Sequence, residues 1–302
     1  MASVAVIAAS LGSTGFAALA TALKHRSATR MAHASRLHPR SRVKALAAAA
    51  VEPLWLCALV ADVGAVGLQV TALHFGALAV VQPLLVTALL FSLLINHAFD
   101  RSMISAKELA WAVALIASLA AFLTVSGASS PAITGPVMAA DKLPAEAAGA
   151  VAIVIVVLCL TAAKMRQGVQ RAGLLGIAIG VIYASTAALI KACTNIATSS
   201  LPGLLTSWQL YAVLAAGLAG LVLSQLAFQA GPLTASLPII AAVDPVLSVA
   251  IGVVIYDERL RTGALAGTAG LTCLLVLAVA AFGLSRAGAA TEQRHSALAA
   301  VS

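Results

Sequence analysis

The sequence predicts an all-α fold, a polytopic transmembrane helical bundle of about nine helices, with ten as the alternative count. Apolar residues make up 62% of the 302 residues and charged residues only 9%, and the mean hydropathy is +1.04. Soluble domains carry about 25% charged residues. The apolar residues also fall into runs close to the roughly 20 residues that a helix needs to cross a bilayer. We therefore expect residues 1–302 to form a single integral membrane domain in contact with lipid.

Nine apolar runs follow one another along the chain, separated by loops. They span residues 3–23, 54–74, 80–99, 109–127, 148–163, 172–193, 208–229, 236–256 and 263–284. No Lys or Arg precedes the first run, so we expect a retained helix rather than a cleaved signal. The fifth run is the shortest of the nine.

The runs divide into two halves around a polar connection with three prolines. We expect a first repeat over about 3–127, a linker over 128–147, a second repeat over about 148–284 and a mobile tail over 285–302. Residues of the two halves match when the sequence is shifted against itself. One shift aligns Gly76, Leu78 and Pro83 with Gly231, Leu233 and Pro238, and a second shift aligns Lys24 with Lys191. Both shifts advance five spans, an odd number, so equivalent helices would cross in opposite directions. This pattern is typical of an inverted repeat.

Basic residues predict the orientation of the chain. The loop over 24–53 holds seven Lys or Arg, which favours a cytoplasmic position. Cytoplasmic loops and the C-terminal tail then hold 14 of the 18 Lys and Arg, external loops hold 3, and Lys191 lies within a span. We expect an external N-terminus and a cytoplasmic C-terminus. The net charge of +8 then fits an anionic membrane surface, and we expect no nucleic-acid partner.

Sequence motifs for catalysis and cofactor binding are missing. The chain contains no P-loop, no Gly-x-Ser-x-Gly, no His-Glu-x-x-His and no dinucleotide-binding glycine motif. The four cysteines lie inside apolar runs without a CxxC pair, which favours neither a disulfide framework nor a zinc site. We therefore expect no enzyme and no cofactor.

Asp244 lies in the middle of the eighth run and is followed by Pro245. A carboxylate at the centre of a membrane helix costs about 2.5 to 3.5 kcal/mol on insertion scales. Pro238 and Pro245 predict a kinked or locally unwound helix, because proline removes a backbone donor. Pro83, near the start of the third run, predicts a second break. A charge beside a helix break is typical of a transporter binding site.

Other polar residues inside the runs could line the same path. Asp62 and Gln69 are seven residues apart and share one helix face. Ser248 follows Asp244 by one turn and either extends its polar face or bonds to its own helix. Gln225 and Gln229, near the cytoplasmic end of the seventh run, either bind a cation or join helices.

The charged residues leave further alternatives open. Asp244 and Asp62 together could hold a metal ion such as Mg²⁺, which one or two carboxylates usually bind. Lys191 either extends outward to the membrane surface or neutralises one of these aspartates. For residues 257–259, Asp-Glu-Arg, we expect a solvated helix end, with a cation-attracting vestibule as the alternative.

One long segment carries a family resemblance. Residues 225–260, QLAFQAGPLTASLPIIAAVDPVLSVAIGVVIYDERL, resemble the end of the second repeat in the drug/metabolite transporter superfamily, EamA-like group. Residues 60–101, with Gln82-Pro83 and a closing Asp100-Arg101, are similar to the equivalent part of its first repeat. Nine helices, an external N-terminus and a basic first loop resemble the NIPA-type branch, whose members are associated with magnesium transport. The superfamily as a whole moves amino acids, sugars, nucleotides, drugs and cations.

The resemblance implies a secondary transporter that moves a small solute, proton or divalent cation by alternating access. The richness in alanine, valine and leucine suggests a bacterium of high GC content, and hence the plasma membrane. The alternatives from other classes are a membrane scaffold and a lipid-modifying membrane protein without solute transport. The sequence leaves the oligomeric state open and is compatible with a homodimer.

Overall fold

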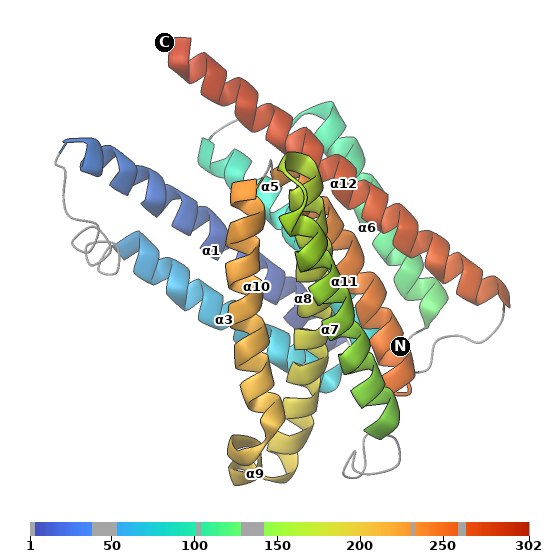
Figure 1. Ribbon diagram of the computed structural model, residues 1–302. Helices are drawn as coiled ribbons and strands as arrows, with labels where there is room; N and C mark the ends of the chain where they lie inside the picture. The colour runs from blue at the N-terminus through green and yellow to red at the C-terminus, as the bar shows by residue number, and fades with distance from the viewer. Residues whose placement is uncertain are drawn as a thin grey trace.

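The computed structural model describes residues 4–37, 53–100, 104–127, 142–230, 233–258 and 264–301. The regular structure of these residues is entirely α-helical (Figure 1). The helices are α1 (Val4–Leu37), α3 (Pro53–Phe75), α4 (Leu78–Leu85), α5 (Ala88–Asp100), α6 (Ala106–Ser126), α7 (Lys142–Lys164), α8 (Gly168–Ser199), α9 (Leu201–Thr206), α10 (Trp208–Ala230), α11 (Leu233–Ile255) and α12 (Ala264–Val301). The predicted all-α bundle is confirmed.

The helices match the nine predicted spans. Among the described residues, seven helical stretches are long and apolar enough to cross a membrane. Two shorter apolar stretches, Trp208–Ser224 and Ile239–Ile255, coincide with the seventh and eighth predicted spans. Large apolar side chains such as Leu158, Leu214 and Leu275 are more than 60% exposed on the outside of the bundle, as expected for a surface that faces lipid rather than water.

Several helices extend beyond the predicted spans. α1 continues to Leu37, inside the predicted basic loop, and α7 begins at Lys142, inside the predicted linker. α12 continues as a helix to Val301, where we expected a mobile tail. These extensions are rich in alanine and other strong helix formers, so the polar residues prolong the helices where hydropathy marks only the apolar part.

The helices pack in two similar sets. α1 packs against α3, α4 and α5, and α8 packs correspondingly against α10 and α11. Across the two halves, α6 packs against α12 and α4 against α11. A repeat that relates α1, α3, α4–α5 and α6 to α8, α10, α11 and α12 accounts for these pairs. The inverted orientation of the two sets in a membrane stays a prediction.

A second pair of contacts follows the same correspondence. The guanidinium of Arg26, on α1, lies 4.0 Å from the ring centre of Phe99, on α5. Lys191 Nζ, on α8, lies 5.1 Å from the ring centre of Tyr256, just after α11. In the two sets of helices, α1 and α8 therefore each place a cation over an aromatic ring at or just after the end of the corresponding helix, α5 or α11.

The short helix α4 lies between the halves. Its residues from Leu78 to Leu84 are all buried. Ala79, Val80 and Leu84 belong to an apolar cluster shared with α6, α11 and α12, and Leu78 and Val81 to one shared with α1, α3 and α8. After Leu85 the helix is interrupted at Val86 and Thr87, whose amides donate to Pro83 and Leu84 at 3.3 and 3.1 Å. The third span is thus broken three residues after Pro83.

α11, by contrast, continues without interruption from Leu233 to Ile255. The local unwinding that we predicted at Pro238 and Pro245 is therefore wrong. Neighbouring helices can satisfy the backbone groups that a proline leaves unpaired, and α11 packs against α8, α4 and α12. The side chain of Pro238 lies outside the described residues, whereas that of Pro245 is buried.

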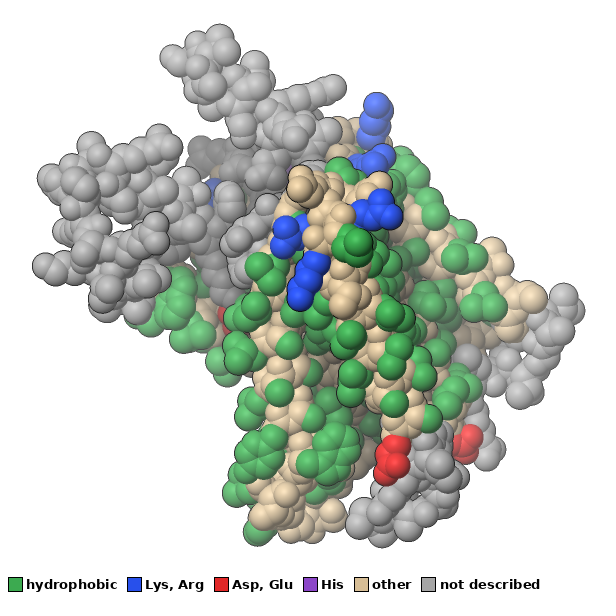
Figure 2. Space-filling model, viewed as in Figure 1, with side chains coloured by type: hydrophobic (Ala, Val, Ile, Leu, Met, Phe, Trp, Pro, Cys, Tyr) green, Lys and Arg blue, Asp and Glu red, His purple; other side chains and the backbone are tan. Residues whose placement is uncertain are grey.

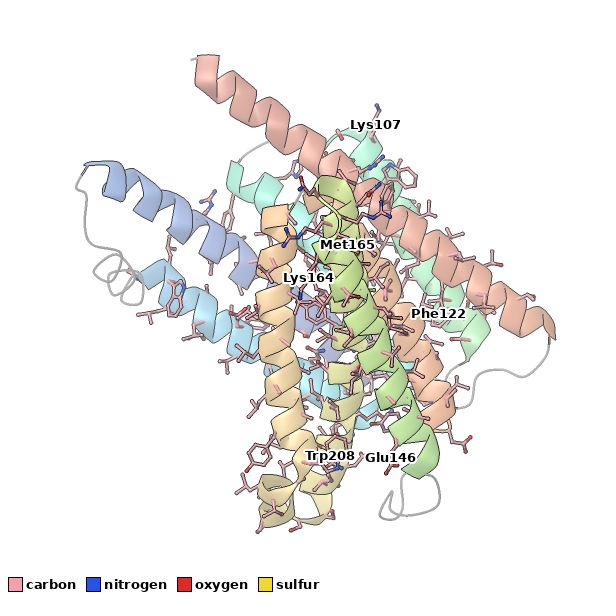
Figure 3. The ribbon with its side chains drawn as sticks, in the orientation of Figure 1. Lys107, Phe122, Glu146, Lys164, Met165 and Trp208 are labelled. Atoms are coloured by element: carbon pink, nitrogen blue, oxygen red, sulfur yellow. The ribbon has the colours of Figure 1, made fainter. Side chains whose placement is uncertain are left out.

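Charged side chains gather at opposite ends of the bundle. In Figure 2, the visible Lys and Arg lie toward the end where α7 meets α8, and the larger patches of Asp and Glu lie toward the other end. Figure 3 places Lys107 and Lys164 toward the first end and Glu146 and Trp208 toward the second. That the basic end faces the cytoplasm stays a prediction.

Candidate functional site

Asp244 lies where α11 contacts α8. Its carboxylate oxygen Oδ1 accepts a hydrogen bond of 3.2 Å from Ser248 Oγ, one turn further along α11. Ser248 is completely buried and Asp244 is half-buried. A Cβ added to Gly180 on α8 would lie 2.7 Å from Val243 and 3.4 Å from the Asp244 amide, so this glycine lets the two helices approach at the aspartate. Ser248 therefore extends the polar face of Asp244, which was the first of the two alternatives that we considered.

Asp244 lies at the same depth in the bundle as the interruption between α4 and α5. A Cβ added to Gly252 on α11 would lie 3.5 Å from the Ala79 amide at the start of α4. Because α4 begins beside the end of α11 and packs along it, the two helices run in opposite directions. From Gly252, eight residues back along α11 lead to Asp244. From Ala79, eight residues forward lead to Thr87. The rise along the helix axis is about 12 Å in each case. The acid and the break therefore share one level.

Hydroxyl groups join the first-half helices around this level. Thr87, in the interruption, donates to the Leu84 carbonyl at 2.7 Å, and its Oγ1 lies 3.2 Å from Thr14 Oγ1 of α1. Ser13 donates to the Ala65 carbonyl of α3 at 2.8 Å. These side chains are small, so the polar layer allows α1, α3 and the α4–α5 break to pack closely.

Asp62 and Gln69 lie apart from Asp244. Both are half-buried on α3, which packs mainly against α1, whereas α11 packs mainly against α8 and α12. The described part of the chain contains no group of three or more His, Cys, Asp or Glu residues that could hold a metal ion. The two acids belong to helices that pack mainly against different partners, and their binding of one metal ion stays a prediction.

The two glutamines of α10 are described only through their backbone. Gln225 and Gln229 lie on the helix, but their side chains fall outside the described residues. Their neighbour Ser224 is buried and donates to the Gly220 carbonyl at 2.7 Å. Its Oγ also lies 3.1 Å from the Tyr183 hydroxyl of α8, which makes this part of α10 a contact surface between helices.

Lys191 and Glu258 form a buried ion pair of 2.5 Å. Each residue is 2% exposed. Our expectations of a lysine that extends to the surface or pairs with an aspartate, and of a solvated Glu258, are both wrong. Lys191 Nζ also donates to the Gly76 carbonyl, in the link between α3 and α4, at 3.0 Å. The pair therefore connects α8, the end of α11 and the α3–α4 link.

Glu258 also caps the start of α4. Its carboxylate accepts the amides of Leu78 and Ala79 at 2.5 and 2.9 Å, the first donors of a helix whose own N-cap residue, Ala77, has no side-chain acceptor. An anion at a helix N-terminus is favourable because the helix dipole is positive there. A remote glutamate thus replaces the local cap.

The end of α11 brings Glu258 into this position. Asp257 adopts a left-handed φ of 48°, and the Glu258 amide then donates to the Gly252 carbonyl at 3.0 Å. Gly252 leaves room for the carboxylate, because a Cβ there would overlap with it. Tyr256 donates to the Ala188 carbonyl at 2.6 Å. The sequence contains a signal for this pair, because Lys191 lies within one span and Glu258 lies at the same end of another.

Comparison with known proteins identifies a relative of nearly equal extent. An uncharacterized protein of Corynebacterium glutamicum is 28% identical over 268 residues, which cover 88% of this chain and 89% of the relative. No family model and no solved structure matches the chain. The similarity extends over most of both sequences, and the name of the relative assigns it no activity.

Proposed function

We propose that this protein is a secondary transporter in which Asp244 binds the transported or coupling ion. The observation that carries the proposal is the environment of Asp244. The acid lies at the depth of a helix break, and its hydrogen-bond partner among the described residues is the neutral hydroxyl of Ser248. An acid within a membrane span that lacks a cationic partner is a candidate for reversible binding of a proton or cation.

Alternating access would follow from the arrangement of the two helix sets. The ion would bind between α11 of one set and α4 of the other, which pack against each other. Different affinities in the inward-open and outward-open states would then drive exchange between the states. Asp62 and Gln69 would line a path along α3.

The proposed class is the drug/metabolite transporter superfamily, EamA-like group, close to its NIPA-type branch. The support is the resemblance of residues 60–101 and 225–260 to the repeats of that superfamily. The cargo would be a small solute or a cation, with Mg²⁺ as the most specific candidate. The protein would lie in a bacterial plasma membrane with an external N-terminus and a cytoplasmic C-terminus.

Flux into proteoliposomes tests this function. Purified protein is reconstituted and assayed with Mg²⁺, protons and a panel of amino acids. We expect flux of at least one substrate, with a loss of about tenfold or more in Asp244→Asn, equal to about 1.4 kcal/mol. Ser118→Ala is the matched control, since this buried serine on α6 donates only to the Leu115 carbonyl of its own helix. A scaffold would move no substrate, and normal flux in Asp244→Asn would contradict the role of the acid.

The orientation has a separate test. Ser200 lies exposed between α8 and α9, on the side that we assign to the exterior. In a variant without the four native cysteines, Ser200→Cys should react with a membrane-impermeant maleimide added to intact cells. Labelling only after the cells are opened would reverse the assigned orientation.

A further inference from the structure

The network around Lys191 and Glu258 joins the two halves of the chain. Lys191 and Glu258 both belong to the second half, and their other partners belong to the first. Lys191 Nζ donates to the Gly76 carbonyl at 3.0 Å. Glu258 accepts the amides of Leu78 and Ala79 at the start of α4. The first half therefore relies on the second half for the hydrogen-bond acceptors at this helix start.

Apolar side chains close the same end of the bundle around the ion pair. Leu78 and Val81 of α4 share a buried cluster with Leu73 of α3 and Ala187 of α8, and Ile251 of α11 packs against it. The first four of these side chains are at most 1% exposed. The ion pair and the cluster thus lie together where the halves meet.

The two halves separate toward the basic end. α8 packs against α3 and α4, but among the described residues it does not pack against α5, which continues the same span as α4. α5 packs against α1 and α12 instead. Figure 1 shows α1 running away from α8 and α10 toward its own C-terminal end. α8 therefore meets the first half at the end with the ion pair and not at the basic end.

Stability alone does not explain why this contact between the halves carries charges. Replacement of a buried ion pair by apolar side chains of similar volume is often neutral or stabilising. Charged groups, however, are far better hydrated than apolar groups when they are exposed. A charged contact therefore lowers the free energy of a second state in which this end is open to water, whereas an apolar contact would raise it.

The internal repeat places matching residues at the basic end. Lys24 and Leu233 are the counterparts of Lys191 and Leu78. Lys24 lies on α1 and Leu233 begins α11, and these two helices do not pack against each other in the described part of the chain. The helices that would make the equivalent contact at the basic end are thus apart while the other end is closed.

We propose that the network of Lys191 and Glu258 is a gate, which closes the end of the bundle that we assign to the exterior and opens during transport. This inference rests on the proposed function. In the closed state, the Glu258 carboxylate caps α4 and the Lys191 ammonium holds the α3–α4 link. On opening, α8 and the end of α11 move away from the start of α4, and water hydrates both charges.

The accessibility of a buried cysteine tests the gate without a transport assay. Ala79 is completely buried at the start of α4, and Ala79→Cys keeps the amide that donates to Glu258. The variant is made in full-length protein without the four native cysteines, placed in lipid nanodiscs and treated with a membrane-impermeant maleimide. Ser126→Cys is the matched control, because Ser126 is also buried and ends α6 on the same side of the bundle.

The double substitution Lys191→Met/Glu258→Gln is the test variant, since it removes both charges and leaves neither one buried alone. In this background, Ala79→Cys should react about tenfold faster or more, because the open state becomes more populated. Ser126→Cys should react at its unchanged rate. Equal acceleration at both positions would show a general loosening and overturn the gate, as would an unchanged rate at Ala79→Cys.

A distance measurement covers the case in which the double variant does not fold. Spin labels are attached at Phe75→Cys and Ser200→Cys, two exposed positions at the end with the ion pair, one in each half. With Lys191 and Glu258 intact, we expect a second population with a longer distance between the labels. Flux with a single fixed distance would reject the gate and leave the transporter proposal intact. Opening without flux of any tested substrate would reject the transporter proposal and leave the opening.

Discussion

Asp244 and Glu258 are acids on the same short part of the chain, one inside α11 and one just after it, yet their surroundings differ in kind. Glu258 accepts hydrogen bonds from a lysine and two backbone amides. Asp244 accepts one from a serine hydroxyl. A fully paired acid holds three segments together, whereas an acid with a neutral partner keeps capacity for an exchangeable ion. Burial alone therefore does not identify the functional acid; the charge of its partners does.

The comparison predicts its largest effect at Lys191. Lys191→Met should lower the free energy of unfolding by about 3 to 5 kcal/mol, because it leaves the buried Glu258 without its cation. Chemical denaturation in detergent measures the loss. Combining it with Glu258→Gln should recover part of the stability, since the double variant buries no unpaired charge. An unchanged stability in Lys191→Met would mean that Glu258 does not depend on the lysine.

A smaller effect is expected at Gly252, which leaves space for the Glu258 carboxylate. Gly252→Ala should cost about 1 to 3 kcal/mol, because the added methyl group displaces the carboxylate from α4. Gly217→Ala is the matched control, since a Cβ there meets nothing within 4 Å. Equal unfolding temperatures for the two variants would show that the carboxylate has room to move.

Tyr256 tests the outer part of the same network. Tyr256→Phe removes the hydrogen bond to the Ala188 carbonyl and should reduce stability by about 0.5 to 1.5 kcal/mol. The aromatic ring next to Lys191 is kept, so the ion pair should remain. Circular dichroism during heating measures the change, and a loss as large as that of Lys191→Met would show that the hydroxyl, not the pair, holds α8 to α11.

The smallest change in stability is expected on the Asp244 side. Ser248→Ala removes one neutral hydrogen bond and should leave the unfolding free energy within about 1 kcal/mol of wild type. The concentration of ion needed for half-maximal flux should rise, roughly twofold to tenfold, for the loss of one oxygen ligand. Ser118→Ala should change neither quantity. A decrease in the free energy of unfolding as large as that of Gly252→Ala would show that Ser248 has a structural role.

The fold could be predicted because the length of an apolar run fixes where a helix crosses a membrane. The helix ends could not, since the polar extensions of α1 and α12 follow helix propensity rather than hydropathy. The breaks predicted at the prolines were also only partly correct. The chain is interrupted after Pro83 but remains helical through Pro245, because packing by neighbouring helices, which the sequence does not display, decides the outcome.

The candidate site was predictable to the extent that it is local. Asp244 and Ser248 lie one helical turn apart, so their spacing predicted a shared face. Lys191 and Glu258 are 67 residues apart, and Glu258 meets Leu78 across 180 residues. Such contacts require tertiary packing and the left-handed residue Asp257, which turns the glutamate back beneath Gly252.

A paired measurement on the two acids tests the central claim most directly. Asp244→Asn and Glu258→Gln are reconstituted in parallel, and flux and unfolding temperature are recorded for both. We predict that Asp244→Asn keeps the wild-type unfolding temperature and loses flux by about tenfold or more, equal to about 1.4 kcal/mol. Glu258→Gln should unfold at a clearly lower temperature. Wild-type flux in Asp244→Asn, or equal losses of stability in both variants, would contradict the division between a binding acid and a structural one.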